Sequence, residues 1–324
     1  MLCSPPFVAP RSRAQNPHET MKPTALISSV VFSLFATAAF AQEATTPPVQ
    51  KHLLRISASV GTEHRLVQTS EVTTTVEQPQ GKVEMLQSTS LWVHAKVVAV
   101  DGGKTTMRHS YERLKAKMTG MANVDYDSDD PESRPGPLGR LADMVGETAT
   151  VVVSERGAVL SMDAPEVLEG GASGIDMKQM MMQAVPEMPD EPVAIGATWL
   201  SETNAPVGRF GDMKCKITNK LVSVEKGIAR LDQKMEFATD ALNLPGGMTI
   251  EVRDATAYTM VDLSSGMTAD SETSMSMVMS MPQGMKMNMA MKTTMKRVDP
   301  AAEAAAKKDA KQSEAEKKPA EAGK

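Results

Sequence analysis

The chain has 324 residues, of which 41% are hydrophobic, 23% are charged and only 3% are aromatic, and its formal charge is −5. This length accommodates one or two domains with a sizeable core, and the acidic balance excludes nonspecific nucleic-acid binding through a basic surface. Two cysteines exclude a disulfide scaffold and a cysteine-rich zinc site. The 27 methionines are the one large departure from average composition.

The first residues indicate export. Met21 to Ala41 reads MKPTALISSVVFSLFATAAFA, in which Lys22 provides a positive n-region, an apolar stretch follows, and Ala39-Phe40-Ala41 forms a small-residue cleavage site. The apolar part is shorter than the roughly 20 residues of a membrane-spanning helix. We therefore expect residues 1–41 to be an N-terminal extension plus a signal peptide cleaved after Ala41. The mature protein should be periplasmic or secreted, without a stable transmembrane anchor.

Polar segments flank the predicted domain. Residues 42–50 (QEATTPPVQ) form a linker, and residues 299–324 are an Ala/Lys/Glu run without an apolar face, which is typical of a solvated low-complexity tail. Residues 51–298 alternate with a period of two between short turn signals, which predicts about a dozen antiparallel strands. The alternation is clearest from Lys82 to Val100, where one predicted face holds Val83, Met85, Leu91, Val93, Ala95, Val97 and Ala99.

Turns and helices are predicted from local composition. Hairpin turns are expected at Gln78–Gly81, Asp101–Gly103, Ser154–Gly157, Glu225–Gly227 and Ser264–Gly266. Two segments break the alternation and predict helices, Pro137 to Val145 and Ser173 to Val185, the latter with Met180 and Met181 on its apolar side.

The most informative segment is the hairpin predicted for Ser274 to Lys292. Methionine alternates with other residues on both sides of Pro282-Gln283-Gly284, a three-residue loop with glycine last. If the loop closes a hairpin, residue numbers that sum to 566 face each other, and eight thioethers form two rows on one face. These are Met275, Met277, Met279, Met281, Met285, Met287, Met289 and Met291.

Three interpretations of this methionine face remain open. It can be a sheet face that fills the core, although methionine specifies a core poorly. It can be a deformable wall for an apolar ligand such as a lipid or a lipoprotein acyl chain, since unbranched, polarizable side chains repack around different shapes; Met180 and Met181 would then add to the wall. It can also capture Cu(I), for which thioethers are suitable soft ligands.

Other patterns argue against catalysis. The sequence contains no HExxH, GxSxG, P-loop or dinucleotide-binding motif. Asp125 to Asp130 starts like a calcium loop, but Asp130 occupies the position that requires glycine and Gly136 offers no carboxylate at the twelfth. Cys215 lies on the apolar side of its strand, as a small core residue does. We expect a protein that is not an enzyme and has no cofactor.

Two stretches resemble a known family. They are VDYDS at 124–128, followed by PLGRLADMVG and TATVVVSERGAVLSM, and the proline-led strand from Val185 to Trp199. Together they are similar to an exported bacterial family of unknown function that shares the curved-sheet fold of periplasmic lipoprotein carriers of the LolA and LolB type. The resemblance spans residues 50–298 and assigns no functional residue. Tyr126 and Trp199 match its pattern, and the simplest interpretation is that both are structural anchors. In carriers of this shape a concave sheet covered by helices holds acyl chains, so the resemblance implies such a surface here.

The sequence therefore predicts a mainly β protein, an antiparallel curved sheet or incomplete barrel partly covered by one or two helices. The leading expectation for its function is noncatalytic binding of an apolar ligand on the methionine face. A periplasmic Cu(I)-binding protein and a structural envelope protein with a methionine-rich core are the alternatives. Lipid or lipoprotein is the expected partner, nucleic acid is not, and the oligomeric state is left open.

Overall fold

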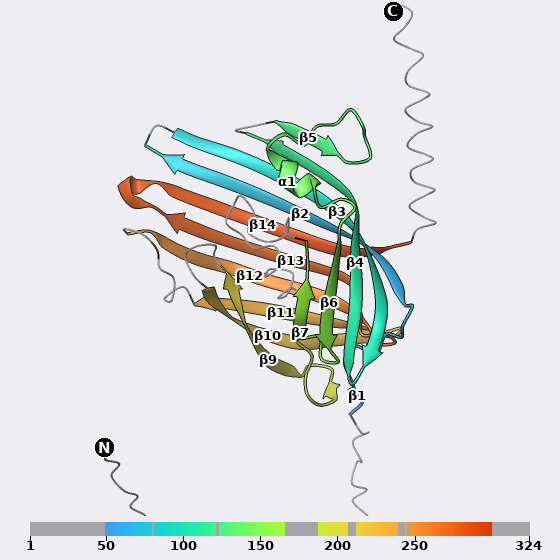
Figure 1. Ribbon diagram of the computed structural model, residues 1–324. Helices are drawn as coiled ribbons and strands as arrows, with labels where there is room; N and C mark the ends of the chain where they lie inside the picture. Colours follow the sequence, from blue (N-terminus) through green and yellow to red (C-terminus); the bar gives the residue numbers. More distant parts are fainter. Residues whose placement is uncertain are drawn as a thin grey trace, which may run out of the picture. The chain divides into compact units, whose positions relative to one another are not determined.

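The computed structural model describes residues 49–79, 81–120, 123–165, 187–206, 212–238, 244 and 247–299. The predicted signal peptide, the helix predicted at 173–185 with Met180 and Met181, and the tail beyond residue 299 lie outside these residues. The described part is built almost entirely of strands (Figure 1). They are β1 (Lys51–His52), β2 (Glu63–Gln78), β3 (Gly81–Asp101), β4 (Lys104–Thr119), β5 (Val124–Asp127), β6 (Thr148–Ser154), β7 (Val159–Asp163), β8 (Val193–Ala194), β9 (Thr198–Pro206), β10 (Asp212–Glu225), β11 (Ile228–Ala238), β12 (Thr249–Asp262), β13 (Met267–Ser280) and β14 (Lys286–Val298).

Twelve of these strands form one antiparallel sheet. Its order is β7-β6-β4-β3-β2-β14-β13-β12-β11-β10-β9, and β5 pairs with β4 beside β6. Most neighbours in the sheet are also neighbours in sequence, because short turns join antiparallel strands. The exceptions are the pairing of β4 with β6, between which β5 intervenes in sequence, and the pairing of β2 with β14, which joins the first long strand to the last. The sheet does not close into a barrel, so the predicted mainly β fold with a curved, open sheet is confirmed.

The turns form where the sequence places glycine. The strands end and restart at each of the five predicted turns. At the turn between β3 and β4, Gly102 and Gly103 adopt φ of 53° and 75°, a left-handed region that side chains with a Cβ rarely enter. The first predicted helix is present in shortened form as a 3-10 turn, Gly136–Leu138, followed by α1, Gly139–Ala142.

The predicted apolar face of β3 is confirmed from Leu91 to Val97, is only partly buried at Met85, and fails at Val83 and Ala99, which are exposed. Leu91, Val93, Ala95 and Val97 are buried, whereas Ala99 is exposed. The pairing of β3 with β4 shifts register between Val97 and Ala99, which indicates a β-bulge. A bulge inserts one residue and breaks the alternation, a change that a period-two pattern does not reveal.

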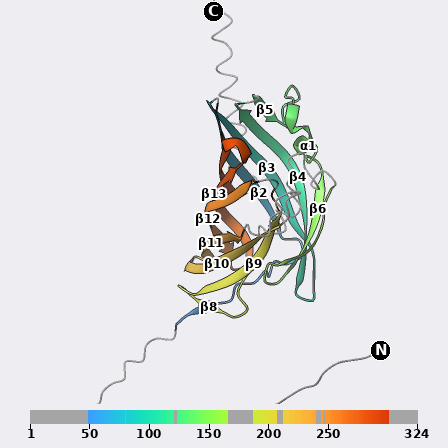
Figure 2. The same cartoon turned by 90° about the vertical axis from the view of Figure 1, so that its left-hand side faces the viewer.

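The sheet curves so that its two arms face each other. In Figures 1 and 2, β4, β6 and β7 lie opposite β10, β11 and β12. At one end the arms pack together in a core that includes Val151 and Val153 from one side and Leu221 and Leu231 from the other. Met144, next to α1, is 1% exposed within this core. We call the side of the sheet that holds this core the inner face.

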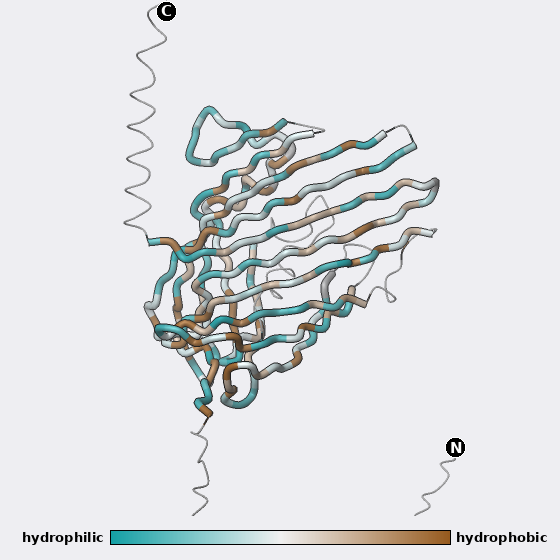
Figure 3. Tube along the Cα trace, turned by 180° about the vertical axis from the view of Figure 1, so that it is seen from behind, coloured by the Kyte–Doolittle hydropathy of each residue, from teal (hydrophilic) through white to brown (hydrophobic). Residues whose placement is uncertain are grey.

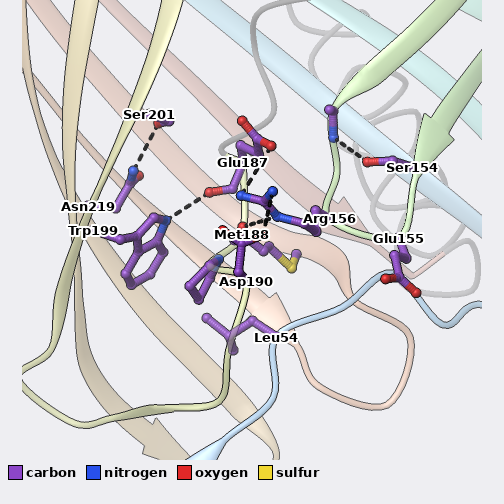
Figure 4. Close-up of polar contacts among 12 residues, drawn as sticks. Leu54, Ser154, Glu155, Arg156, Glu187, Met188, Asp190, Trp199, Ser201 and Asn219 are labelled. Carbon is purple, nitrogen blue, oxygen red and sulfur yellow. Dashed lines mark hydrogen bonds and ion pairs between the residues drawn. The ribbon is translucent and has the colours of Figure 1, made fainter. Parts of the chain in front are cut away.

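The segment from Glu187 to Asp190 fastens the two edges of the open sheet at this end (Figure 4). Its Met188 accepts a hydrogen bond from Arg156 Nε and donates one from its backbone to the Arg156 carbonyl, both 2.8 Å long. On the other edge, Trp199 Nε1 donates to the Glu187 carbonyl at 2.8 Å. An ion pair of 2.7 Å joins Arg156 to Asp190. Trp199 is thus a structural anchor, as predicted.

Candidate functional site: the methionine face

The methionine hairpin closes in the predicted register. Met275 pairs with Met291, Met277 with Met289 and Met279 with Met287. Beyond them the backbone of Met281 donates to the carbonyl of Met285 at 2.9 Å, and Gly284 in the turn adopts φ of 78°. The loop length fixes this register, and the register fixes the face, because side chains alternate along a strand. The two rows of thioethers therefore share one face, as the sequence predicts.

This face is the inner face. Leu231 in β11 pairs with Thr259 in β12, which pairs with Ser271 in β13. The same row continues through β14 and β2 to Leu91 in β3. Leu231 and Leu91 belong to the core, so every second residue from Ser271 along β13 points to the core side. Met275 lies four residues further along, on the same side.

Neighbouring strands extend the apolar surface. The methionine rows continue in register into β2, β3 and β12. The side chains added are Val72, Val76, Val83, Met85, Ile250, Val252 and Ala255. Six residues along the strands and five strands across give an area of about 20 Å by 20 Å. We call this surface, with the eight hairpin methionines, the methionine face.

A polar row separates the methionine face from the core. Gln233 Nε2 donates to Asn219 Oδ1 at 3.0 Å within this row, and Thr259 Oγ1 of the neighbouring core row donates to Gln233 Oε1 at 3.2 Å. Between β14 and β2, the Thr293 hydroxyl donates to Ser70 Oγ at 3.3 Å. Buried polar groups that bond one another in this way hold their strands in register.

The methionine face is not part of the packed core. All eight hairpin methionines are partly exposed, and none belongs to the buried cluster at the closed end. The buried methionines, such as Met144 and Met188, come from other segments. The hairpin methionines therefore line a surface that remains partly open to a ligand.

The inner and outer faces of these strands differ sharply in charge. From the polar row to the hairpin turn, the registers place no charged residue on the inner face of the described strands. The intervening residues face outward and include Lys216, Glu251, Lys286, Glu71 and Lys117. Polar and apolar residues follow one another along the strands in Figure 3. A shallow depression of about 360 Å³ is lined mostly by outward-facing residues, and Glu71, Asp254 and Lys292 place charged groups at it.

The titratable groups of the interior are shifted by burial. Burial lowers the pKa of His109 to about 4 and raises the pKa of the Cys215 thiol to about 11. Cys215 is 3% exposed, which confirms the prediction of a small core residue. It lies three strands from β13, about 14 Å away, so it is not a partner of the hairpin thioethers. In the described ranges, no cluster of three or more His, Cys, Asp or Glu side chains can hold a metal ion.

Sequence reasoning missed the residues that β2, β3 and β12 contribute to this surface. Their short apolar runs predicted strands, but only the long-range pairing of β2 with β14 brings Val72 and Met85 beside the hairpin. The available signal was the absence of charge at every second position of these strands. Met180 and Met181, expected as additional wall, fall outside the described residues.

Comparisons with known proteins find distant structural similarities and no sequence relative. No family model matches the chain, and no curated protein matches it. A lipovitellin structure concerned with lipid-protein interactions is 9% identical over 74% of this chain, with a TM-score of 0.46. The match covers only 25% of the lipovitellin chain.

Two further matches are of the kind that the sequence resemblance implies. A domain of an outer membrane lipoprotein-sorting protein from Vibrio parahaemolyticus is 10% identical, covering 72% of this chain and 83% of that one, with a TM-score of 0.17. A DUF1329 family protein from Desulfovibrio piger is 12% identical, covering 69% and 83%, also with a TM-score of 0.17. At these scores the similarities carry no argument about what this chain binds. Within its described residues, no helix combines the length and hydrophobicity needed to cross a membrane.

Proposed function

We propose that this protein is an exported, noncatalytic binding protein that holds an apolar ligand, such as a lipid or a lipoprotein acyl chain, on the methionine face. The observation that carries the proposal is an uncharged inner face, partly exposed and about 20 Å across, that continues from a closed core. Export is supported by the signal-like sequence at residues 21–41.

The proposed mechanism is burial of apolar area. Transfer of apolar surface from water contributes roughly 25 cal/mol per Å², so a chain that covers the face gains several kcal/mol before the cost of association. Methionine suits a ligand of variable shape, because its unbranched side chain changes rotamer without leaving a void. The rigid closed end, with its clasp of Arg156, Met188 and Trp199, holds the strands in place while the side chains of the face adapt.

A pair of fourfold variants tests the proposal. Met277, Met279, Met287 and Met289 form the centre of the face, and we replace all four with serine or all four with leucine. The serine variant should keep its β-sheet circular dichroism and lose binding of the fluorescent fatty acid anthroyloxy-stearate. The leucine variant should bind, because leucine is apolar and of similar size. Binding that persists in a folded serine variant contradicts the assignment of this surface.

Cu(I) binding is the second candidate, because the three paired rows place thioethers directly across from each other. Cross-strand neighbours have Cβ atoms about 4.5–5.5 Å apart, so several soft sulfur ligands can reach one ion. The leucine variant separates the two functions, since it keeps the apolar surface and removes the sulfur. Copper bound by the wild type and lost in the leucine variant would favour this candidate.

A further inference from the structure

The described methionines of this chain fall into two groups of different exposure. The eight of the hairpin are partly exposed on the methionine face, while others are enclosed, for example Met144 at 1% and Met188 at 2% exposure. The described part of the chain has one cysteine, Cys215, and burial keeps its thiol protonated. Other partly exposed methionines, such as Met85 and Met118, are scattered over the described strands, whereas the hairpin gathers eight. The hairpin therefore offers a peroxide in solution the densest group of accessible sulfurs in the described part of the chain, and the enclosed sulfurs are shielded from it.

We propose that the hairpin thioethers are a redox-controlled modification site whose conversion to sulfoxide releases the apolar ligand. This inference rests on the proposed function and adds its regulation. The oxidant is a hydroperoxide, as arises from reactive oxygen species outside the cytoplasm.

The chemistry is a two-electron oxygen transfer. A lone pair of the methionine Sδ attacks one peroxide oxygen, the O–O bond breaks, and an S–O bond forms. The departing oxygen takes up a proton and leaves as water or an alcohol, so sulfur is oxidised and the peroxide is reduced. A dithiol reductant reverses the change: its two thiols become a disulfide and the sulfoxide oxygen leaves as water.

The geometry explains why such oxidation affects binding and not the fold. The strands of the hairpin are held by backbone hydrogen bonds of β13 with β12 and of β14 with β2, which do not involve the thioethers. Each sulfoxide instead places a strong dipole on a face that otherwise lacks charge. A ligand chain lying there would bury that dipole without a hydrogen-bond partner, which is unfavourable.

The choice of residue agrees with this role. β-branched residues favour strands, and this chain uses them where strands are buried, as in Val151 and Val153 of β6. An apolar face made only for bulk would be better served by valine or isoleucine. Methionine provides the same apolar character together with an atom that oxidation makes polar and reduction restores.

The test uses the full chain, hydrogen peroxide and the same fluorescent fatty acid. The purified protein is treated with graded peroxide, freed of it, digested and analysed by mass spectrometry, while a second portion is titrated with anthroyloxy-stearate. We expect the hairpin peptides to gain oxygen at peroxide levels that leave the peptides of Met144 and Met188 unchanged. Affinity should fall at least about tenfold and return after reduction.

The fourfold leucine variant is the matched control. With Met277, Met279, Met287 and Met289 replaced by leucine, peroxide should lower the affinity by a clearly smaller factor than in the wild type, because only four of the eight hairpin thioethers remain. Equal oxidation of hairpin and buried methionines in the folded protein would refute the hairpin as a selective oxidation site. Full oxidation of the hairpin with undiminished binding would refute the switch. If the untreated, reduced wild type binds no fatty acid, the proposed function is refuted instead. The peptide masses would then still show whether the hairpin methionines are oxidised before the buried ones.

Discussion

Replacing single methionines by alanine measures whether the methionine face is an open surface or part of the core. The matched pair is Met277→Ala on the face and Met144→Ala in the core, which delete the same atoms. Met144 is 1% exposed and packs within the buried cluster, whereas Met277 is partly exposed on a face outside it. The stability cost of the two changes should therefore differ.

The expected loss of stability for each substitution depends on what fills the space left by the side chain. In the core, removal of the Met144 side chain forfeits its transfer free energy and leaves a cavity, which together cost about 3 kcal/mol. On the face, water enters the vacated space, so only part of the transfer term is lost, about 1 kcal/mol or less. Met144→Ala should thus lower the free energy of unfolding about three times as much as Met277→Ala.

Urea denaturation provides the measurement. Circular dichroism follows the sheet, and tryptophan fluorescence follows Trp92 in β3 together with Trp199 at the closed end, where its indole donates to the Glu187 carbonyl. Equal losses of about 3 kcal/mol for Met277→Ala and Met144→Ala would refute the open face. The hairpin would then be core, and the structural interpretation of its methionines would be correct.

Three further predictions concern the supporting structure. Burial opposes ionisation of Asp127, but hydrogen bonds from Arg113 and Lys115 hold the pKa of its carboxyl well below the usual range. Its stabilisation is present above the unfolded pKa near 4 and is lost as pH falls. Asp127→Asn should therefore lower the free energy of unfolding, measured in urea at neutral pH, by about 1–2 kcal/mol. The difference in free energy between variant and wild type should shrink below about pH 4, and a difference that does not change with pH contradicts this. Arg156→Ala should lower the free energy of unfolding by about 2 kcal/mol and speed amide hydrogen exchange around Met188. Unchanged exchange would show that the Arg156 contacts do not hold the two sheet edges together. Cys215 should react with a thiol reagent only once urea unfolds the chain, and rapid labelling of native protein would show that its burial is incomplete.

The sequence predicts the local parts of this molecule well because local chemistry determines them. The Pro282-Gln283-Gly284 loop sets the hairpin register, and glycine at each turn allows the backbone to reverse. Pairings between strands that are far apart in the sequence are not predicted by this local chemistry. The pairing of β2 with β14 joins residues more than 200 positions apart, and no periodic pattern within either strand encodes its partner.

The clasp shows a second limit of sequence reasoning. Arg156 occupies a turn with the composition Ser-Glu-Arg-Gly, which predicts a solvated charge. In the fold its guanidinium instead bonds the Met188 carbonyl and pairs with Asp190, because the curvature of the sheet brings the opposite edge within reach. A structural anchor is the simplest interpretation of Trp199 in the sequence, but its partner, the Glu187 carbonyl, is set by the tertiary fold alone.

Native mass spectrometry tests the central claim most directly. The protein is exported to a copper-supplemented periplasm, purified without detergent or chelator, and measured beside the fourfold serine variant. A ligand-binding face predicts a heterogeneous adduct of lipid mass on the wild type that is absent from the variant. A discrete mass increase of one or a few copper ions on the wild type, with no lipid, would contradict the claim and identify the thioethers as a metal site.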